Sequence, residues 1–408
     1  MITRLEIRNF KSFRNVALDL GRLNLFVGAN ASGKSNFFDA LRVLQGIGNG
    51  FTVSEILDGK PKSASSEVWE GIRGGSAKAC FEGPAKEDRF TIMVDGSLAP
   101  ILAGHGLTDW RYSVTLAPAL GWVASESLEY GGKTLYRTDP SKRSGGPIHT
   151  VTLATGNPGR PPNRKLERSR PVLPQFAKLR DRNLLRTADA AKIAAELADM
   201  QRMDPAPSVL RSYSQAHRIE RMGERGENFA ALVKTLSEDP ATKSAFLDWL
   251  RELRPEELDD VATLSGAVGE PLFMLREAGR EFPAPVLSDG TLRFAALVAA
   301  FFQPDMPRIM TIEEIENGVH ASRARALVEL LRGRAADEKT QILATTHSPT
   351  VLAWLDPEEY ATTYFFRRDP DTGEASATPL SEIRNFREVI EKHPIGDLFA
   401  EGWMEAAS

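Results

Sequence analysis

The feature that most constrains this chain is the stretch GANASGKS at residues 28–35. It fits the pattern G-x-x-x-x-G-K-[ST], follows the apolar run LNLFV and precedes the helical pattern SNFFDALRVLQGI. Glycines let such a loop curl so that its N–H groups point at a phosphate, where the helix N-terminus adds a favourable field. The alternative is a glycine turn with a chance lysine. Because strand, loop and helix occur together, we predict a nucleotide-binding loop in an α/β fold.

The residues of this loop have separate expected roles. Lys34 is expected to reach the β- and γ-phosphates, and the Ser35 hydroxyl to ligate Mg²⁺. Asn30 and Gly33 complete the predicted contacts to the nucleotide. The expected cofactors are therefore ATP and Mg²⁺.

A second strand-like run, RIMTI, ends in two adjacent carboxylates, Glu313 and Glu314. Ligands of parallel sheets bind beyond the carboxyl ends of the strands. Glu313 is predicted to hold Mg²⁺, usually through water, and Glu314 to orient and polarise the attacking water. A solvated glutamate cluster that caps the next helix is the alternative for an isolated pair. Beside a complete phosphate loop, we favour catalysis.

Two histidines lie near these strand-like runs, and we interpret them differently. His347 comes directly after the strand-like run QILATT, where it can hydrogen-bond the γ-phosphate or the attacking water. A histidine satisfied by the local backbone is the better interpretation of an isolated residue, and we assign His320 to that class.

The stretch VLSDGTLRFAAL at residues 286–297 is a second glycine-containing helix start. Ser288, Asp289 and Gly290 are cap and turn residues, and apolar side chains follow at helical spacing. A capped core helix is one explanation. The start of that helix would also offer unpaired N–H donors and a positive dipole end to an anion.

Composition sets broad limits on the class of protein. The 408 residues are 42% hydrophobic, which is enough for a large core and an embedded or second domain. The N-terminus has no secretory apolar region, and the longest apolar run, 294–302, is too short to span a bilayer. Cys80 is the single cysteine, which excludes an intrachain disulfide. We expect a cytoplasmic protein without a membrane partner.

The pattern along the chain predicts a split core with an insertion. Strand and helix patterns alternate in residues 1–60 and 265–408, which indicates an ATPase core with parallel strands. Residues 77–153 contain recurring β-type segments and predict an antiparallel lobe. Residues 154–260 read as a basic linker followed by a helical insertion.

With these motifs together, the sequence resembles the ABC-type ATPase heads of the SMC/RecF/OLD group, and in particular stand-alone AAA-family ATPases of bacteria. LEIRNFKSF, GANASGKSNFFDAL, LSDGTLR, IEEIENGVH and TTHSP occur in the order of that group, within residues 1–45 and 285–355. The resemblance implies a P-loop ABC-ATPase head with a mixed or parallel core sheet, an antiparallel β lobe and a helical insertion. It also implies hydrolysis of ATP to ADP and phosphate.

The same resemblance gives LSDGT a role as the ABC signature, which acts across a homodimer. Two heads would pack head to tail, so that Ser288 and Gly290 of one copy meet the γ-phosphate held by Lys34 of the other. Asn317 and Gly318 match the loop that touches the second subunit. ATP would hold the dimer together and hydrolysis would release it.

The sequence departs from related families at two places. Asp289 and Thr291 stand where transporter ATPases usually carry Gly and Gln, which favours the SMC/RecF/OLD side. No glutamine takes the place of the Q-loop residue, because Gln45 lies too early, inside the helix after the phosphate loop. The C-terminal tail has no run of acidic metal ligands like that of the nuclease domain of OLD enzymes.

The basic segment at residues 159–186 holds nine Lys/Arg residues, opposed only by Glu167 and Asp181. Such a segment can neutralise DNA phosphates without reading sequence, although a solvated loop and helix face is the simpler explanation. We predict an ATP-dependent switch that acts on DNA or on a protein effector such as a nuclease, in DNA repair or antiviral defence. The alternatives are the nucleotide-binding subunit of an ABC transporter and an ATP-binding scaffold with negligible turnover.

Overall fold

The computed structural model describes the chain apart from residues 61–68, 84–86, 99–107, 139–145, 155–161, 180–183, 185, 253–257, 338–339 and 408. The described chain divides into two compact units. The first unit contains Met1–Gly21, Gly28–Met200 and Phe365–Thr378, and the second contains Arg22–Val27, Gln201–Tyr364 and Pro379–Ser408. Among the described residues, no helix is both long and apolar enough to cross a lipid bilayer.

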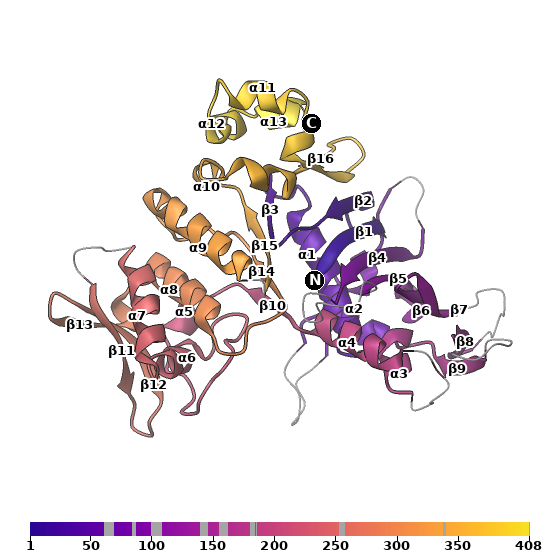
Figure 1. Cartoon of the computed structure of the whole chain (residues 1–408), viewed down its shortest axis with the longest axis horizontal. Coiled ribbons are helices and arrows are strands. Elements are labelled where there is room, and N and C mark those ends of the chain that lie inside the picture. The colour runs from indigo at the N-terminus through magenta and orange to yellow at the C-terminus, as the bar shows by residue number, and fades with distance from the viewer. Residues whose placement is uncertain are drawn as a thin grey trace. The chain divides into compact units, whose positions relative to one another are not determined.

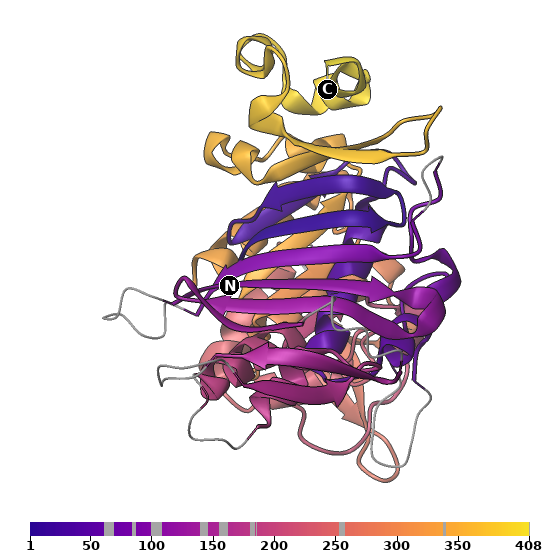
Figure 2. The ribbon, with the colours of Figure 1, turned by 90° about the vertical axis from the view of Figure 1, so that its right-hand side faces the viewer.

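An eight-stranded sheet forms most of the first unit, and its strands lie side by side in Figure 2. All neighbouring strands in it are antiparallel. Alternation explains its buried face: Phe90, Ile92 and Val94 point inward from one strand, and the partly exposed Thr91 and Met93 lie between them. In sheet order the strands are β2 (Phe13–Asp19), β1 (Ile2–Phe10), β4 (Phe90–Ser97), β5 (Asp109–Ala117), β6 (Trp122–Tyr130), β7 (Lys133–Thr138), β8 (Ile148–Leu153) and β9 (Asn163–Glu167).

The helices of the first unit are α1 (Lys34–Gly48), α2 (Val53–Asp58), α3 (Val172–Ala177) and α4 (Thr187–Ala198). On α1, Phe37, Leu41 and Leu44 are buried, as their shared helical face predicts. Two of these helices, α1 and α4, pack against each other. The helix that follows the phosphate loop is thereby held by apolar contacts along its length.

A six-stranded sheet carries the strands that precede the predicted site residues. Its order is β10 (Met200–Met203), β14 (Ile309–Ile312), β15 (Gln341–Thr346), β3 (Leu23–Val27), β16 (Thr363–Arg368) and β17 (Ala375–Pro379). The three strands β14, β15 and β3 are parallel neighbours in the second unit. Each is buried along its whole length, as strands covered on both faces are. These strands confirm the predicted parallel core.

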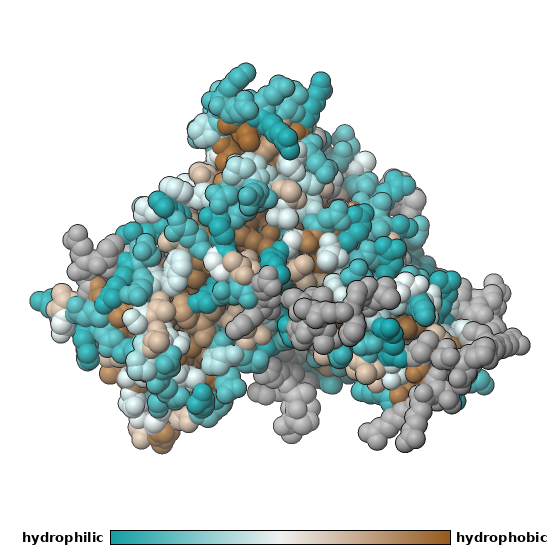
Figure 3. Space-filling model, viewed as in Figure 1, coloured by the Kyte–Doolittle hydropathy of each residue, from teal (hydrophilic) through white to brown (hydrophobic). Residues whose placement is uncertain are grey.

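Helices and a small antiparallel sheet complete the second unit (Figure 1). The sheet consists of β11 (Leu258–Ser265), β12 (Pro271–Glu277) and β13 (Arg280–Pro283), and Phe273 packs on Phe229 with ring centroids 4.6 Å apart. The hairpin between β11 and β12 ends in an apolar tip, where Val268 is exposed (Figure 3). The helices are α5 (Pro207–Leu210), α6 (Phe229–Leu236), α7 (Pro240–Arg251), α8 (Asp289–Phe302), α9 (Ala324–Ala336), α10 (Pro349–Leu352), α11 (Phe386–Ile390), α12 (Ile395–Ala400) and α13 (Trp403–Ala407).

Candidate active site

The phosphate loop connects the buried strand β3 directly to α1. Gly33 caps the helix with φ 113°, in the left-handed region that favours glycine, and Ala31 also has a positive φ of 65°. A Cβ atom on Gly33 would lie 2.8 Å from the Cβ of Ala375, so a larger residue would not fit without movement. Asn30 is exposed in the same loop. The loop is therefore tightly curled, as the motif predicts.

Two polar groups inside this loop fit a bound phosphate. The Nζ atom of Lys34 donates to the carbonyl oxygens of Gly28 at 2.6 Å and Ala29 at 2.8 Å, which folds the lysine back over its own loop. The Oγ atom of Ser32 is buried and has no hydrogen-bond partner within the described structure. Buried hydroxyls are normally hydrogen-bonded. A phosphate oxygen would provide the partner that the Ser32 hydroxyl lacks.

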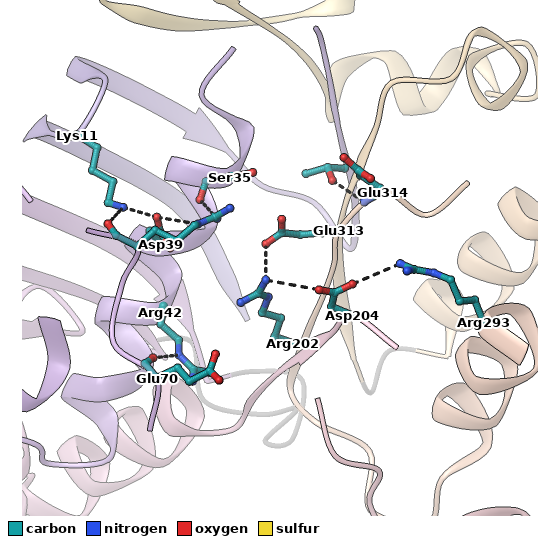
Figure 4. A network of polar contacts seen from close by, with 12 residues as sticks. Lys11, Ser35, Asp39, Arg42, Glu70, Arg202, Asp204, Arg293, Glu313 and Glu314 are labelled. Carbon is teal, nitrogen blue, oxygen red and sulfur yellow. Dashed lines mark hydrogen bonds and ion pairs between the residues drawn. The ribbon is translucent and has the colours of Figure 1, made fainter. Parts of the chain in front are cut away.

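An ion-pair cluster, buried at Lys11 and Asp39, supports the start of α1 in the first unit (Figure 4). The Nζ atom of Lys11 donates to Oδ2 of Asp39 at 2.5 Å and to the carbonyl oxygen of Arg73 at 2.6 Å. Arg73 in turn donates from Nη2 to the carbonyl oxygen of Ser35 at 2.6 Å. Burial lowers the pKa of Lys11, while the Asp39 carboxylate opposes that shift. The sequence motifs contain Lys11 and Asp39 but give no sign that they pair.

The two predicted catalytic carboxylates follow β14 in the second unit. Glu314 has a positive φ of 49°, a strained conformation for a non-glycine residue, and its backbone N–H donates to Oγ1 of Thr345 at 2.8 Å. Glu313 is 16% exposed and forms an ion pair with Arg202, with Nη2 and Oε1 3.2 Å apart (Figure 4). His320, rather than either glutamate, caps the following turn by accepting a hydrogen bond from the Ser322 N–H. The helix-capping alternative therefore does not describe this pair.

His347 follows β15 and is held by a glutamate that the sequence analysis did not single out. Both its backbone N–H and its Nδ1 atom contact Oε1 of Glu316, at 2.7 Å and 2.9 Å. A carboxylate on Nδ1 fixes the ring orientation and leaves Nε2 for another partner. The His347 side chain is 45% exposed. Glu316 lies within the motif IEEIENGVH. A third carboxylate shortly after an apolar strand is the feature of the sequence that could have identified it as a site residue.

Strand register shows where the chain segments that carry these residues begin. Ile312 pairs with Ala344 on the next strand, and Thr346 pairs with Val27 on the strand after it. The chain segments that begin after Ile312, Thr346 and Val27 therefore start at the same edge of the parallel sheet. Among the described residues, no group of three His, Cys, Asp or Glu side chains forms a metal-binding cluster.

The predicted signature segment lies at the start of α8, also in the second unit. Ser288 caps this helix, accepts a hydrogen bond from the Thr291 N–H at 3.2 Å and is exposed. Gly290 approaches Gly318 so closely that a Cβ atom on Gly290 would lie 1.7 Å from the Gly318 carbonyl oxygen. Arg211 donates to the Leu287 carbonyl at 2.8 Å and to Oδ1 of Asp289 at 2.6 Å. The segment is therefore both exposed and fixed in place.

Several cations of the basic segment serve the structure of the first unit. Arg168 stacks on the Trp122 ring at 4.8 Å, and Arg186 stacks on the Tyr130 ring at 4.7 Å. Arg170 donates to the Gly50 carbonyl at 2.7 Å. Arg164 and Lys165 are exposed on β9, which is an edge strand. Arg160, Arg180 and Arg182 lie outside the described residues.

Gln45, which lies too early for a Q-loop residue, and Gln201 both make structural contacts. Gln45 donates to the Met200 carbonyl at 2.5 Å, within the first unit. Gln201, the next residue after that carbonyl, donates to the Met222 carbonyl at 2.7 Å and accepts from Gln303 at 2.7 Å. The adjacent Arg202 is the residue of β10 that reaches a predicted site carboxylate. Sequence reasoning missed it because its strand is only four residues long.

Comparisons with known proteins identify the ATPase domains. The family described as "AAA domain, putative AbiEii toxin, Type IV TA system" matches residues 161–353, and the family described as "AAA ATPase domain" matches residues 1–62. An "ATP/GTP phosphatase" of Helicobacter pylori (strain ATCC 700392 / 26695) is 23% identical over 377 residues, which cover 87% of this chain and 88% of that protein.

Solved structures of SMC heads share the fold. An SMC head bound to the C-terminal winged-helix domain of ScpA matches with a TM-score of 0.53 and 14% identity, over 93% of this chain and 98% of that one. The Pyrococcus furiosus Smc head with an extended coiled coil, bound to the C-terminal domain of ScpA, matches with a TM-score of 0.50 and 12% identity, over 96% and 99%. Residues 1–62 and 161–353 thus match AAA-type ATPase domains, the fold is similar to that of SMC heads, and the chain is an ATPase.

Proposed function

We propose that two copies of this chain associate head to tail on ATP and separate after hydrolysis, which makes the ATPase a switch. In each copy the phosphates bind to the loop, the water is activated from the strand edge, and the signature segment of the second copy closes the site. The residues assigned to these roles are Asn30, Gly33, Lys34 and Ser35 for the nucleotide, Glu314 and His347 for catalysis, and Ser288 and Gly290 for closure.

The observation that carries this proposal is the exposed, capped start of α8. Ser288 is exposed rather than buried in its own subunit, and the first turn of a 14-residue helix presents N–H donors and a positive dipole end. Arg211 neutralises Asp289, which would otherwise repel a triphosphate. The segment therefore has the exposure and the charge needed to receive the γ-phosphate of another copy.

The residues assigned to the nucleotide and to catalysis also include oxygen ligands for Mg²⁺. We propose that the Ser35 hydroxyl and the Glu313 carboxylate hold it, since oxygen ligands suit this cation and phosphates supply the remainder. When bound, Mg²⁺ would neutralise charge on the β- and γ-phosphates. Glu314 would then accept the hydrogen bond of the attacking water, and His347 would contact the γ-phosphate through Nε2 while Glu316 holds Nδ1.

We further propose that the switch acts on a protein effector or on DNA, in defence or repair. The similar SMC heads bind a partner protein, ScpA, which supports a protein effector. Arg164, Lys165 and Lys178 are exposed, while Arg168 and Arg186 also stack on aromatic rings of the first unit, so DNA is the weaker option.

Glu314→Gln tests the switch directly. The variant should bind ATP within about threefold of the wild type and release phosphate about 10²- to 10⁴-fold more slowly, because a general base contributes about that factor. It should also accumulate as a dimer with ATP, measured by light scattering coupled to size exclusion. Glu329→Gln, on the exposed surface of α9, is the matched control and should leave all three measurements unchanged. A Glu314→Gln variant that stays monomeric at saturating Mg²⁺-ATP would overturn the proposal.

A further inference from the structure

A chain of four charged residues runs through the second unit from Glu313 to the signature helix (Figure 4). The Nη2 atom of Arg202 is 3.2 Å from Oε1 of Glu313 and 3.9 Å from Oδ2 of Asp204. Arg293, one turn into α8, donates to Oδ1 of Asp204 at 3.3 Å. The charges therefore alternate along a continuous path of side chains.

The two ends of this path are partly shielded from water. The side chains of Glu313 and Arg293 are 16% and 14% exposed, so solvent and salt screen their interactions less than those of surface pairs. Arg202 is permanently charged, and its planar guanidinium constrains a carboxylate more tightly than an ammonium does. The path can therefore fix the orientation of the Glu313 side chain as well as hold the oppositely charged groups together.

The position of Arg202 in the fold supports a role beyond packing. Its strand, β10, neighbours β14, the strand that ends just before Glu313. The strand is anchored without Arg202, because Met200 and Met203 are buried. The Gln201 side chain also donates one buried hydrogen bond and accepts another. Removal of the Arg202 head group should therefore leave β10 in place.

We propose that Arg202 is a positioning residue that orients the Glu313 carboxylate for Mg²⁺-nucleotide and couples it, through Asp204, to Arg293 in the signature helix. This inference rests on the proposed function, in which Glu313 holds Mg²⁺. Groups that hydrogen-bond or pair with a metal-binding carboxylate fix its geometry, and their loss typically weakens metal binding about 10- to 100-fold. The backbone contact between Gly318 and Gly290 joins the same two elements by a second route.

A competing role for Arg202 predicts the opposite change in Mg²⁺-dependent nucleotide affinity. If its guanidinium blocked Glu313 until the metal displaced it, removal of Arg202 would strengthen Mg²⁺-dependent nucleotide binding. If the ion pair only stabilised the fold, removal would lower the unfolding temperature and leave nucleotide binding unchanged.

The first experiment compares Arg202→Gln with the wild type by calorimetric titration of a non-hydrolysable ATP analogue, in Mg²⁺ and in EDTA. Affinity in Mg²⁺ should fall about 10- to 100-fold, and affinity in EDTA should stay within about twofold. Arg218→Gln is the matched control, because Arg218 forms exposed ion pairs with Glu220 and Glu238 in the same unit. Tighter or unchanged binding of Arg202→Gln in Mg²⁺ would overturn the proposal. Arg202→Lys, which keeps the charge, should recover part of the affinity and serves if the glutamine variant fails to fold.

The second experiment tests the coupling to α8 by a double-mutant cycle. Arg293→Gln should also weaken binding in Mg²⁺, and the double variant should lose at least about twofold less than the product of the two single effects. Strictly multiplicative effects would refute the coupling through Asp204. If the wild-type protein itself bound no nucleotide, the proposed function would be refuted instead. Failure of the proposed function is therefore distinguishable from failure of the Arg202 proposal.

Discussion

The phosphate loop of the first unit and the carboxylate edge of the second are built by different means. The loop is one continuous stretch, whose glycine backbone and single lysine make most of the predicted contacts. The edge is assembled from segments far apart in the sequence, and side-chain pairs such as Arg202 with Glu313 and Glu316 with His347 set its geometry. Local backbone geometry thus defines the phosphate loop, and long-range ion pairs define the carboxylate edge.

The sharpest test of this contrast is Lys34→Ala. Nucleotide affinity should fall at least about 100-fold, because two or more charge-assisted hydrogen bonds at about 1.5–3 kcal/mol each are lost. The loss should be similar in Mg²⁺ and in EDTA, unlike the loss expected for Arg202→Gln. Calorimetric titration of ATP measures it, with Lys78→Ala, an exposed lysine paired with Glu82, as the control. An effect seen only in Mg²⁺ would mean that Lys34, like Arg202, acts through the metal.

The contrast also explains how far the sequence predicted the structure. The phosphate loop, α1 and the strands β3, β14 and β15 were predicted because motif, periodicity and burial agree within short windows. Arg202 and Glu316 were missed because their partners depend on which strands become neighbours. Segment 159–186 looked like one basic surface, since stacking of Arg168 on Trp122 depends on tertiary packing that a charge count does not include.

The first unit also contains a buried carboxylate held by long-range contacts, Glu126, and its titration provides the next test. It accepts hydrogen bonds from the N–H groups of Val172 and Leu173 and from the Tyr136 hydroxyl. Burial raises the pKa of Glu126 to about 7. The unfolded carboxyl ionises near 4.5, so between these values the folded state retains a proton that the unfolded state has lost.

Stability should therefore fall as pH rises from about 4.5 to about 7, by roughly 3 kcal/mol from this group. Urea unfolding at pH 5 and pH 8 measures the difference, and Glu126→Gln should remove this contribution. Glu129→Gln, on the same strand but partly exposed, should retain it. Identical pH dependence in both variants would show that Glu126 does not control the response.

The smallest effect is expected in the second unit, at the backbone approach between Gly290 and Gly318. A Cβ atom on Gly290 would lie 1.7 Å from the Gly318 carbonyl oxygen, so Gly290→Ala must displace one of two backbones, at a cost of about 1–3 kcal/mol in the free energy of unfolding. Gly333→Ala, in α9, meets no atom within 4 Å and should instead stabilise the protein by about 0.5–1 kcal/mol. Urea unfolding followed by circular dichroism measures both. If Gly290→Ala were as stable as the wild type, the signature segment would be free to move away from the Gly318 loop, and the carboxylate edge of the second unit would be less rigid than its ion pairs indicate.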